Sequence, residues 1–80
     1  MKTTLLLFGI AVDLADSSSL EIELPNKSTV ASFKEFISNE FPEFQKMSSY
    51  AVAINESYAS DDTLIRENDI IAIIPPVSGG

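Results

Sequence analysis

The sequence contains no cysteine and no histidine. Without cysteine the chain has no disulfide, no thiolate ligand and no thiol nucleophile, and without histidine it lacks the usual general base and the commonest metal ligand. These absences exclude a catalytic triad and a zinc site of the usual histidine and cysteine type. Any chemistry in which the chain takes part must use carboxyl, hydroxyl or backbone groups, or come from a partner.

Positive charge is also scarce. Five Lys and Arg residues stand against twelve Asp and Glu residues, which gives a net charge of −7. Such a chain repels nucleic-acid phosphates and anionic membrane surfaces, so we expect neither as a partner. A basic patch on another protein is the natural complement, although ordinary solubility explains the charge as well. At 80 residues the chain makes one small domain, which buries about 60% of its unfolded surface.

No apolar run approaches the ~20 residues of a membrane span. The N-terminal run Leu5–Val12 follows a single positive charge at Lys2 and is closed by Asp13. A secretory signal would have this general form, but its removal would delete a strand from an already small core. We therefore expect this run to be a buried first strand and the protein to be cytoplasmic.

Hydrophobic periodicity predicts the elements in order. Leu20–Leu24 alternates apolar and acidic residues as a half-buried strand does, and the segment from Leu5 through the turn to Leu20 is expected to form a hairpin. Thr29 is the expected N-cap of a helix over Val30–Glu40. The remaining predictions are strands over Lys2–Phe8, Tyr50–Ile54 and Ile70–Ile74, a helical turn over Ile10–Asp16 and a short edge strand around Tyr58.

This order predicts an α+β fold of the β-grasp (ubiquitin-like) type, a mixed sheet of about five strands over one main helix. The last strand, a buried one, lies beside the first in the middle of the sheet. We divide the chain into a β-grasp domain over residues 1–74 and an extended, flexible C-terminal tail over residues 75–80. Four carboxylates lie close together in the sequence, at Asp61, Asp62, Glu67 and Asp69. We expect no metal site there, because their spacing lacks the alternating ligand loop of a cation site.

The last six residues are the most informative segment, namely Pro75, Pro76, Val77, Ser78, Gly79 and Gly80. The prolines fix φ and carry no N–H, which favours a stiff, extended leader. The two glycines have no side chains and can enter a passage too narrow for other residues. Six extended residues reach roughly 20 Å, far enough to enter the active site of another protein.

With this tail and element order, the chain closely resembles the molybdopterin synthase small subunits, a family of ubiquitin-like sulfur carriers. The resemblance covers essentially the whole chain, and the tail is its most specific part. Leu64, followed by an acidic turn and the last apolar strand, also fits the family pattern. Two positions depart from it: Ile73-Ile74 replaces a frequent aromatic pair, and Asn68 stands where glycine is usual.

The resemblance implies a function. An ATP-dependent enzyme would adenylate the carboxyl group of Gly80, and a sulfur donor would convert it to a thiocarboxylate. That sulfur would build the dithiolene of molybdopterin from cyclic pyranopterin monophosphate, as a step of molybdenum cofactor biosynthesis. Gly79 would allow close backbone approach. The catalytic residues would belong to the large subunit in a heterotetramer, so this chain would be a non-catalytic subunit that binds no cofactor of its own.

The family's docking face is apolar and lies around the first and last strands. The resemblance places contact residues at Phe8, Tyr58 and Ile74, although core packing explains Phe8 and Ile74 equally well. Three other functions stay open: a sulfur carrier for thiamin or cysteine synthesis, a modifier that is conjugated to lysines, and a purely structural interaction domain.

Overall fold

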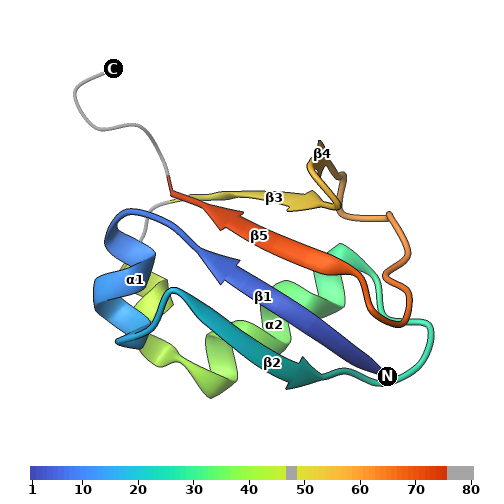
Figure 1. The fold of residues 1–80 in the computed structure, drawn as a ribbon, viewed down its shortest axis with the longest axis horizontal. Helices are drawn as coiled ribbons and strands as arrows, with labels where there is room; N and C mark the ends of the chain where they lie inside the picture. Colours follow the sequence, from blue (N-terminus) through green and yellow to red (C-terminus); the bar gives the residue numbers. More distant parts are fainter. Residues whose placement is uncertain (47–48, 76–80) are drawn as a thin grey trace.

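Figure 1 shows the fold in a computed structural model, which describes residues 1–46 and 49–75. The predicted tail therefore lies outside the described residues, except for Pro75, and the division into domain and tail stays a prediction. The elements follow the order β1 (Lys2–Leu7), α1 (Ile10–Ala15), β2 (Ser19–Glu23), α2 (Val30–Glu40), the 3-10 helix η1 (Pro42–Lys46), β3 (Ala51–Ile54), β4 (Ser57–Tyr58) and β5 (Ile70–Ile74).

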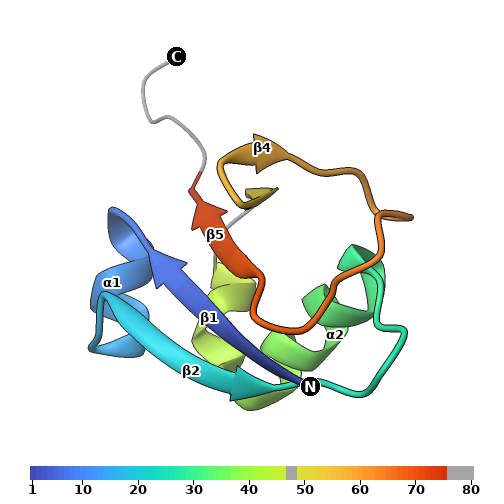
Figure 2. The ribbon, with the colours of Figure 1, turned by 45° about the vertical axis from the view of Figure 1, so that its right-hand side comes forward.

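The five strands form one mixed sheet in the order β2-β1-β5-β3-β4. The first and last strands, β1 and β5, are parallel neighbours, and all other pairs are antiparallel. Leu5 lies opposite Leu20 on one side and opposite Ile71 on the other. Figure 2 shows β4 at the edge of the sheet opposite β2. The predicted β-grasp arrangement, with the last strand beside the first, is confirmed.

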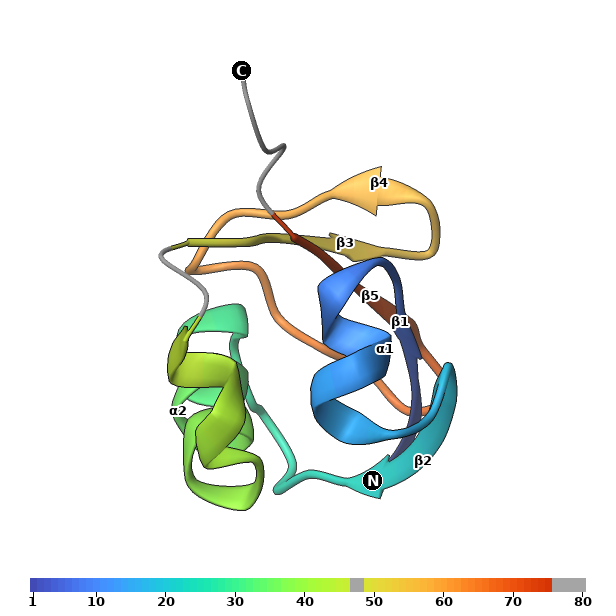
Figure 3. The ribbon, with the colours of Figure 1, turned by 90° about the vertical axis from the view of Figure 1, so that its left-hand side faces the viewer.

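Helix α2 begins and ends where the sequence predicts. The Thr29 hydroxyl accepts a hydrogen bond from the Ser32 N–H at 3.3 Å, and the Ser32 hydroxyl accepts one from the Thr29 N–H at 2.8 Å. This reciprocal capping box satisfies two N–H groups at the helix start that would otherwise lack partners. The inner face of the helix is fully buried, at Val30, Phe33 and Ile37. Figure 3 shows α1 and α2 on the same side of the curved sheet.

The core lies between this helical layer and one face of the sheet. From β1 and α1 it takes Leu5, Leu7 and Ala11, so the N-terminal apolar run is part of the folded domain. Contrary to the prediction, the run is not a single buried strand, because it continues through a turn into α1 and Phe8 is 49% exposed. Among the described residues, no helix has the length and apolar character needed to cross a membrane.

The prediction that β5 is a buried strand is wrong for part of it. Ile71 and Ile73 are fully buried, but Ile70 is 44% exposed and Ile74 is only half-buried. Side chains along a strand point alternately to the two faces of a sheet, and here the described helices cover one face only. The outward side chains of β5 therefore lie on the face without a helical cover.

Candidate functional site

An apolar groove of about 320 Å³ lies on this uncovered face. We call it the apolar groove, and its lining residues are Leu6, Phe8, Ala53, Glu56, Tyr58, Ile70, Ala72 and Ile74. Such a volume is within the range of protein binding sites. The groove brings together all three residues that the sequence analysis singled out as partner contacts. Phe8 is 49% exposed and Tyr58 is 77% exposed, so neither side chain is a core residue.

A tight turn at one end of β1 places Phe8 in this groove. Gly9 adopts φ 55° and ψ −131°, and the N–H of Ala11 donates a hydrogen bond of 3.1 Å to the carbonyl of Phe8. These are the features of a type II′ turn, whose first central position has positive φ and favours glycine. The sequence analysis did not single out Gly9, although a glycine between a strand and a helical pattern is a turn signal.

The same turn lies against the base of the predicted tail. A Cβ atom built on Gly9 would be 3.6 Å from Cγ of Pro75, the first residue after β5. Of the predicted tail residues, Pro75 is therefore placed beside the Phe8 end of the apolar groove. Pro76, Val77, Ser78, Gly79 and Gly80 lie outside the described residues, so their predicted roles stay predictions.

At the β3–β4 end of the groove, a two-residue hairpin turn sets the position of Tyr58. Both turn residues have positive φ, 50° at Asn55 and 72° at Glu56, as in a type I′ turn. The Asn55 amide donates to the Asp69 carboxylate at 3.0 Å and accepts from the N–H of Ile70 at 3.0 Å. The hairpin is thus hydrogen-bonded to the start of β5, and Tyr58 lies opposite Ala53 in the register.

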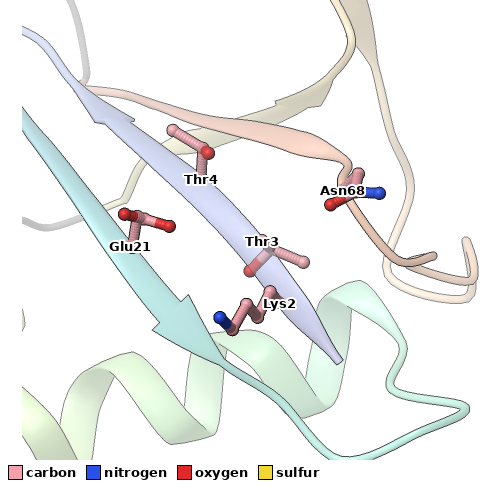
Figure 4. Close-up of a pocket in the computed structure, with 5 residues that line it drawn as sticks. All are labelled: Lys2, Thr3, Thr4, Glu21 and Asn68. Carbon is pink, nitrogen blue, oxygen red and sulfur yellow. The ribbon is translucent and has the colours of Figure 1, made fainter.

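A second hollow, of about 90 Å³, lies among Lys2, Thr3, Thr4, Glu21 and Asn68. Figure 4 shows these side chains spread along two strands and a turn rather than converging on one point. Small-molecule sites usually have volumes of about 300–1,000 Å³ and a few convergent polar groups. This hollow has neither property, so we do not treat it as a candidate site. Asn68 has φ 68°, a left-handed conformation that asparagine adopts more readily than most residues.

The carboxylates considered for a cation site accept local hydrogen bonds. Asp62 accepts from the Ser60 hydroxyl at 2.6 Å, and Glu67 accepts from the N–H of Lys2 at 2.9 Å. Asp61 pairs with Lys34 at 2.9 Å. Within residues 1–46 and 49–75, no three carboxylates gather in a way that could hold a metal ion.

Lys34 and Asp61 belong to a cluster away from the groove. The Lys34 ammonium lies 5.8 Å from the centroid of the Tyr50 ring, within the range of a cation–π contact. Partial burial of Tyr50, with the nearby Asp61 charge as the smaller cause, raises the pKa of its hydroxyl above the ordinary value of 10.0. This cluster joins α2, the loop before β5 and the start of β3, so its evident role is structural.

The mixed sheet, its parallel central pair and the capped helix define a ubiquitin-like β-grasp protein. The same fold occurs in the small archaeal modifier protein SAMP1 of Haloferax volcanii, with a TM-score of 0.86 and 20% identity over the whole of both chains. It also occurs in the complex of subunits 1 and 2 of the molybdopterin-converting factor of Helicobacter pylori, with a TM-score of 0.70, 18% identity and full coverage of both chains.

Sequence comparison identifies the family within this class of proteins. The ThiS family matches residues 5–80, and the chain belongs to that family. It is 35% identical to the molybdopterin synthase sulfur carrier subunit of Arabidopsis thaliana over 81 residues, which cover 100% of this chain and 84% of that protein. It is also 35% identical to the Dictyostelium discoideum protein of the same name over 80 residues, covering 95% of this chain and 93% of the other.

Proposed function

We propose that this chain is the sulfur carrier subunit of a molybdopterin synthase. The observation that carries the proposal is the apolar groove, whose Phe8 end lies beside Pro75, the base of the Pro-Pro-Val-Ser-Gly-Gly tail. A carrier needs a surface that docks on a partner and a nearby end that enters the partner's active site. The relatives in Arabidopsis and Dictyostelium, which carry this name, support the same function.

The chemistry follows from the terminal carboxylate. This group is ionised at neutral pH and is a poor electrophile. In the proposed reaction, the Gly80 carboxylate attacks the α-phosphorus of ATP in an activating enzyme, which releases pyrophosphate and leaves an acyl adenylate. Hydrosulfide delivered by a sulfur donor then attacks the acyl carbon and expels AMP, which forms the thiocarboxylate with no change in oxidation state. The carrier is not itself the catalyst, and ATP is a substrate of the activating enzyme.

The thiocarboxylate sulfur is then transferred to cyclic pyranopterin monophosphate in the large synthase subunit, and a second such transfer supplies the other sulfur of the molybdopterin dithiolene. Water replaces the sulfur at the acyl carbon, which restores the Gly80 carboxylate for another cycle. Pro75 and Pro76 would limit the conformations of the free tail and so lower the entropy lost on insertion. Gly79, with no side chain, would allow the backbone to pass through a narrow entrance.

The proposed docking partner at the apolar groove is the large synthase subunit. The Helicobacter pylori complex pairs a protein of this fold with a second subunit, which supports such an assembly. The half-exposed Phe8 ring and the exposed Tyr58 ring supply the large apolar contacts that commonly dominate binding energy. We propose a cytoplasmic heterotetramer of two carriers and two large subunits.

The test is the intact mass of the chain after incubation with ATP, the cognate activating enzyme and a sulfur donor. We expect a mass increase equal to the replacement of one oxygen by sulfur, located at Gly80 by fragmentation. Deletion of Gly80, or extension by one alanine, should abolish both this change and molybdopterin synthesis while the folded domain persists. A family carrier of known activity serves as the positive control for the activating enzyme.

An unchanged mass beside an active control carrier would refute the proposal. A thiocarboxylate that does not support molybdopterin synthesis with the large subunit would instead indicate a carrier for another pathway, such as thiamin or cysteine synthesis. Isopeptide adducts between Gly80 and lysines of cellular proteins would indicate a protein modifier.

A further inference from the structure

Of the described residues that line the apolar groove, only Glu56 carries a charge. Its neighbours in the groove are aliphatic or aromatic side chains from β1 and the turn after it, and from β3, β4 and β5. Glu56 itself is exposed at the β3–β4 turn. A partner that covers the groove would therefore surround this carboxylate with apolar surface and remove part of its water. Burying a carboxylate without a partner group is strongly unfavourable.

The conformation of Glu56 gives no reason for a glutamate at this position. Its φ of 72° is left-handed, and it occupies the second central position of a type I′ turn, where glycine is the favoured residue. A residue with a Cβ atom in this conformation costs about 1–2 kcal/mol relative to its ordinary one. The turn would form more easily with glycine, so the side chain of Glu56 is retained at an energetic cost.

Glu56 also makes no evident contribution within the domain. Among the interactions of the described residues, its carboxylate takes part in none of the side-chain hydrogen bonds or ion pairs. The residue before it behaves differently, because the Asn55 amide is bonded to both Asp69 and Ile70. The polar side chain of Asn55 thus explains its place in the turn, whereas that of Glu56 does not.

We infer that Glu56 binds a cationic side chain, an arginine or a lysine, on the protein that covers the apolar groove. This inference rests on the proposed function and assigns the partner as the large synthase subunit. The pair would form a charge-assisted hydrogen bond at the rim of an apolar interface, where it strengthens as water is excluded. With a net charge of −7, the chain also favours approach by a basic surface. Glu56 is therefore a specificity residue, which selects a partner with a cation at this end of the groove.

The experiment compares Glu56→Gly with Asp16→Gly. Both substitutions remove one carboxylate from an exposed residue with left-handed φ, 72° at Glu56 and 57° at Asp16. Both should therefore stabilise the isolated domain against urea. Asp16 ends helix α1 and does not line the groove, so it reports the general effect of a lost charge. A third variant, Glu56→Gln, keeps the strained backbone and the side-chain length but removes the charge.

The readout is the dissociation constant of the complex with the cognate large subunit, measured by calorimetry at low and high salt. We expect Glu56→Gly and Glu56→Gln to weaken binding by about tenfold at low salt and to reduce its salt dependence. Asp16→Gly should bind as the wild type does. Equal affinity of the wild type and both Glu56 variants would overturn the inference and leave the proposed function intact. Failure of the wild type to bind the large subunit would overturn both.

Discussion

Replacing Gly9 with alanine should destabilise the domain through backbone strain alone. The φ of 55° and ψ of −131° lie in a region that residues with a Cβ atom rarely occupy, at a cost of about 1–3 kcal/mol. Space does not add to this cost, because the new Cβ would be 3.6 Å from Pro75 Cγ, an ordinary van der Waals contact. Alanine also restricts the unfolded chain, which offsets about 0.4–1 kcal/mol. The expected net loss in free energy of unfolding is about 1–2 kcal/mol.

The assay is equilibrium unfolding in urea followed by circular dichroism. For a small domain with an m-value of about 1 kcal/mol/M, the predicted loss lowers the midpoint by about 1–2 M. Ser18→Ala is the matched control, because Ser18 is exposed beyond the other end of α1 and has no positive φ. Its free energy of unfolding should stay within about 0.5 kcal/mol of the wild-type value. A Gly9→Ala variant with the same urea midpoint as this control would refute the assignment of strain to the turn.

Two further predictions concern α2 and the Tyr50 cluster. Thr29→Ala removes the N-cap hydroxyl and should cost about 1 kcal/mol of unfolding free energy in urea, whereas an unchanged midpoint would contradict the capping box as a source of stability. The raised pKa of Tyr50 means that the unfolded chain loses this proton at lower pH than the folded one. The contribution of Tyr50 to stability is therefore complete below the unfolded pKa of about 10 and falls as pH rises above it. Above that pH, the melting temperature of Tyr50→Phe should fall less steeply with pH than that of the wild type. Parallel plots of melting temperature against pH would contradict this.

Local rules predicted α2 most completely. Thr29 caps the helix, and Val30, Phe33 and Ile37, which follow one another at helical spacing, are buried on its inner face. Both signals depend on residues that are close in the sequence, so α2 could be predicted without knowledge of tertiary contacts. The strand β2 was equally legible, because Glu21 and Glu23 alternate with apolar residues that face the core.

The apolar groove was harder to predict than the fold. All five residues of β5 are apolar, so its sequence lacks the apolar–polar alternation that shows which side chains of a half-buried strand face the core. Phe8 was ambiguous for the same reason. Gly9 was missed because its importance lies in its backbone angles, and Glu56 because the sequence does not show that it lines the groove. Asn55, between two short strands, was nevertheless a turn signal, because asparagine tolerates positive φ.

The central place of β5 has a consequence for how the domain acquires its structure. Strand β5 lies between β1 and β3, yet it comes last in the order of elements. Strand β1 cannot form its parallel pairing until β5 is present. Closing the long loop between the two strands costs entropy before their contacts can offset that cost. A chain interrupted before β5 would leave the β1–β2 and β3–β4 hairpins unjoined and would lack Ile70, Ala72 and Ile74 from the groove. Incomplete chains would thus be unable to compete with finished ones for the same partner.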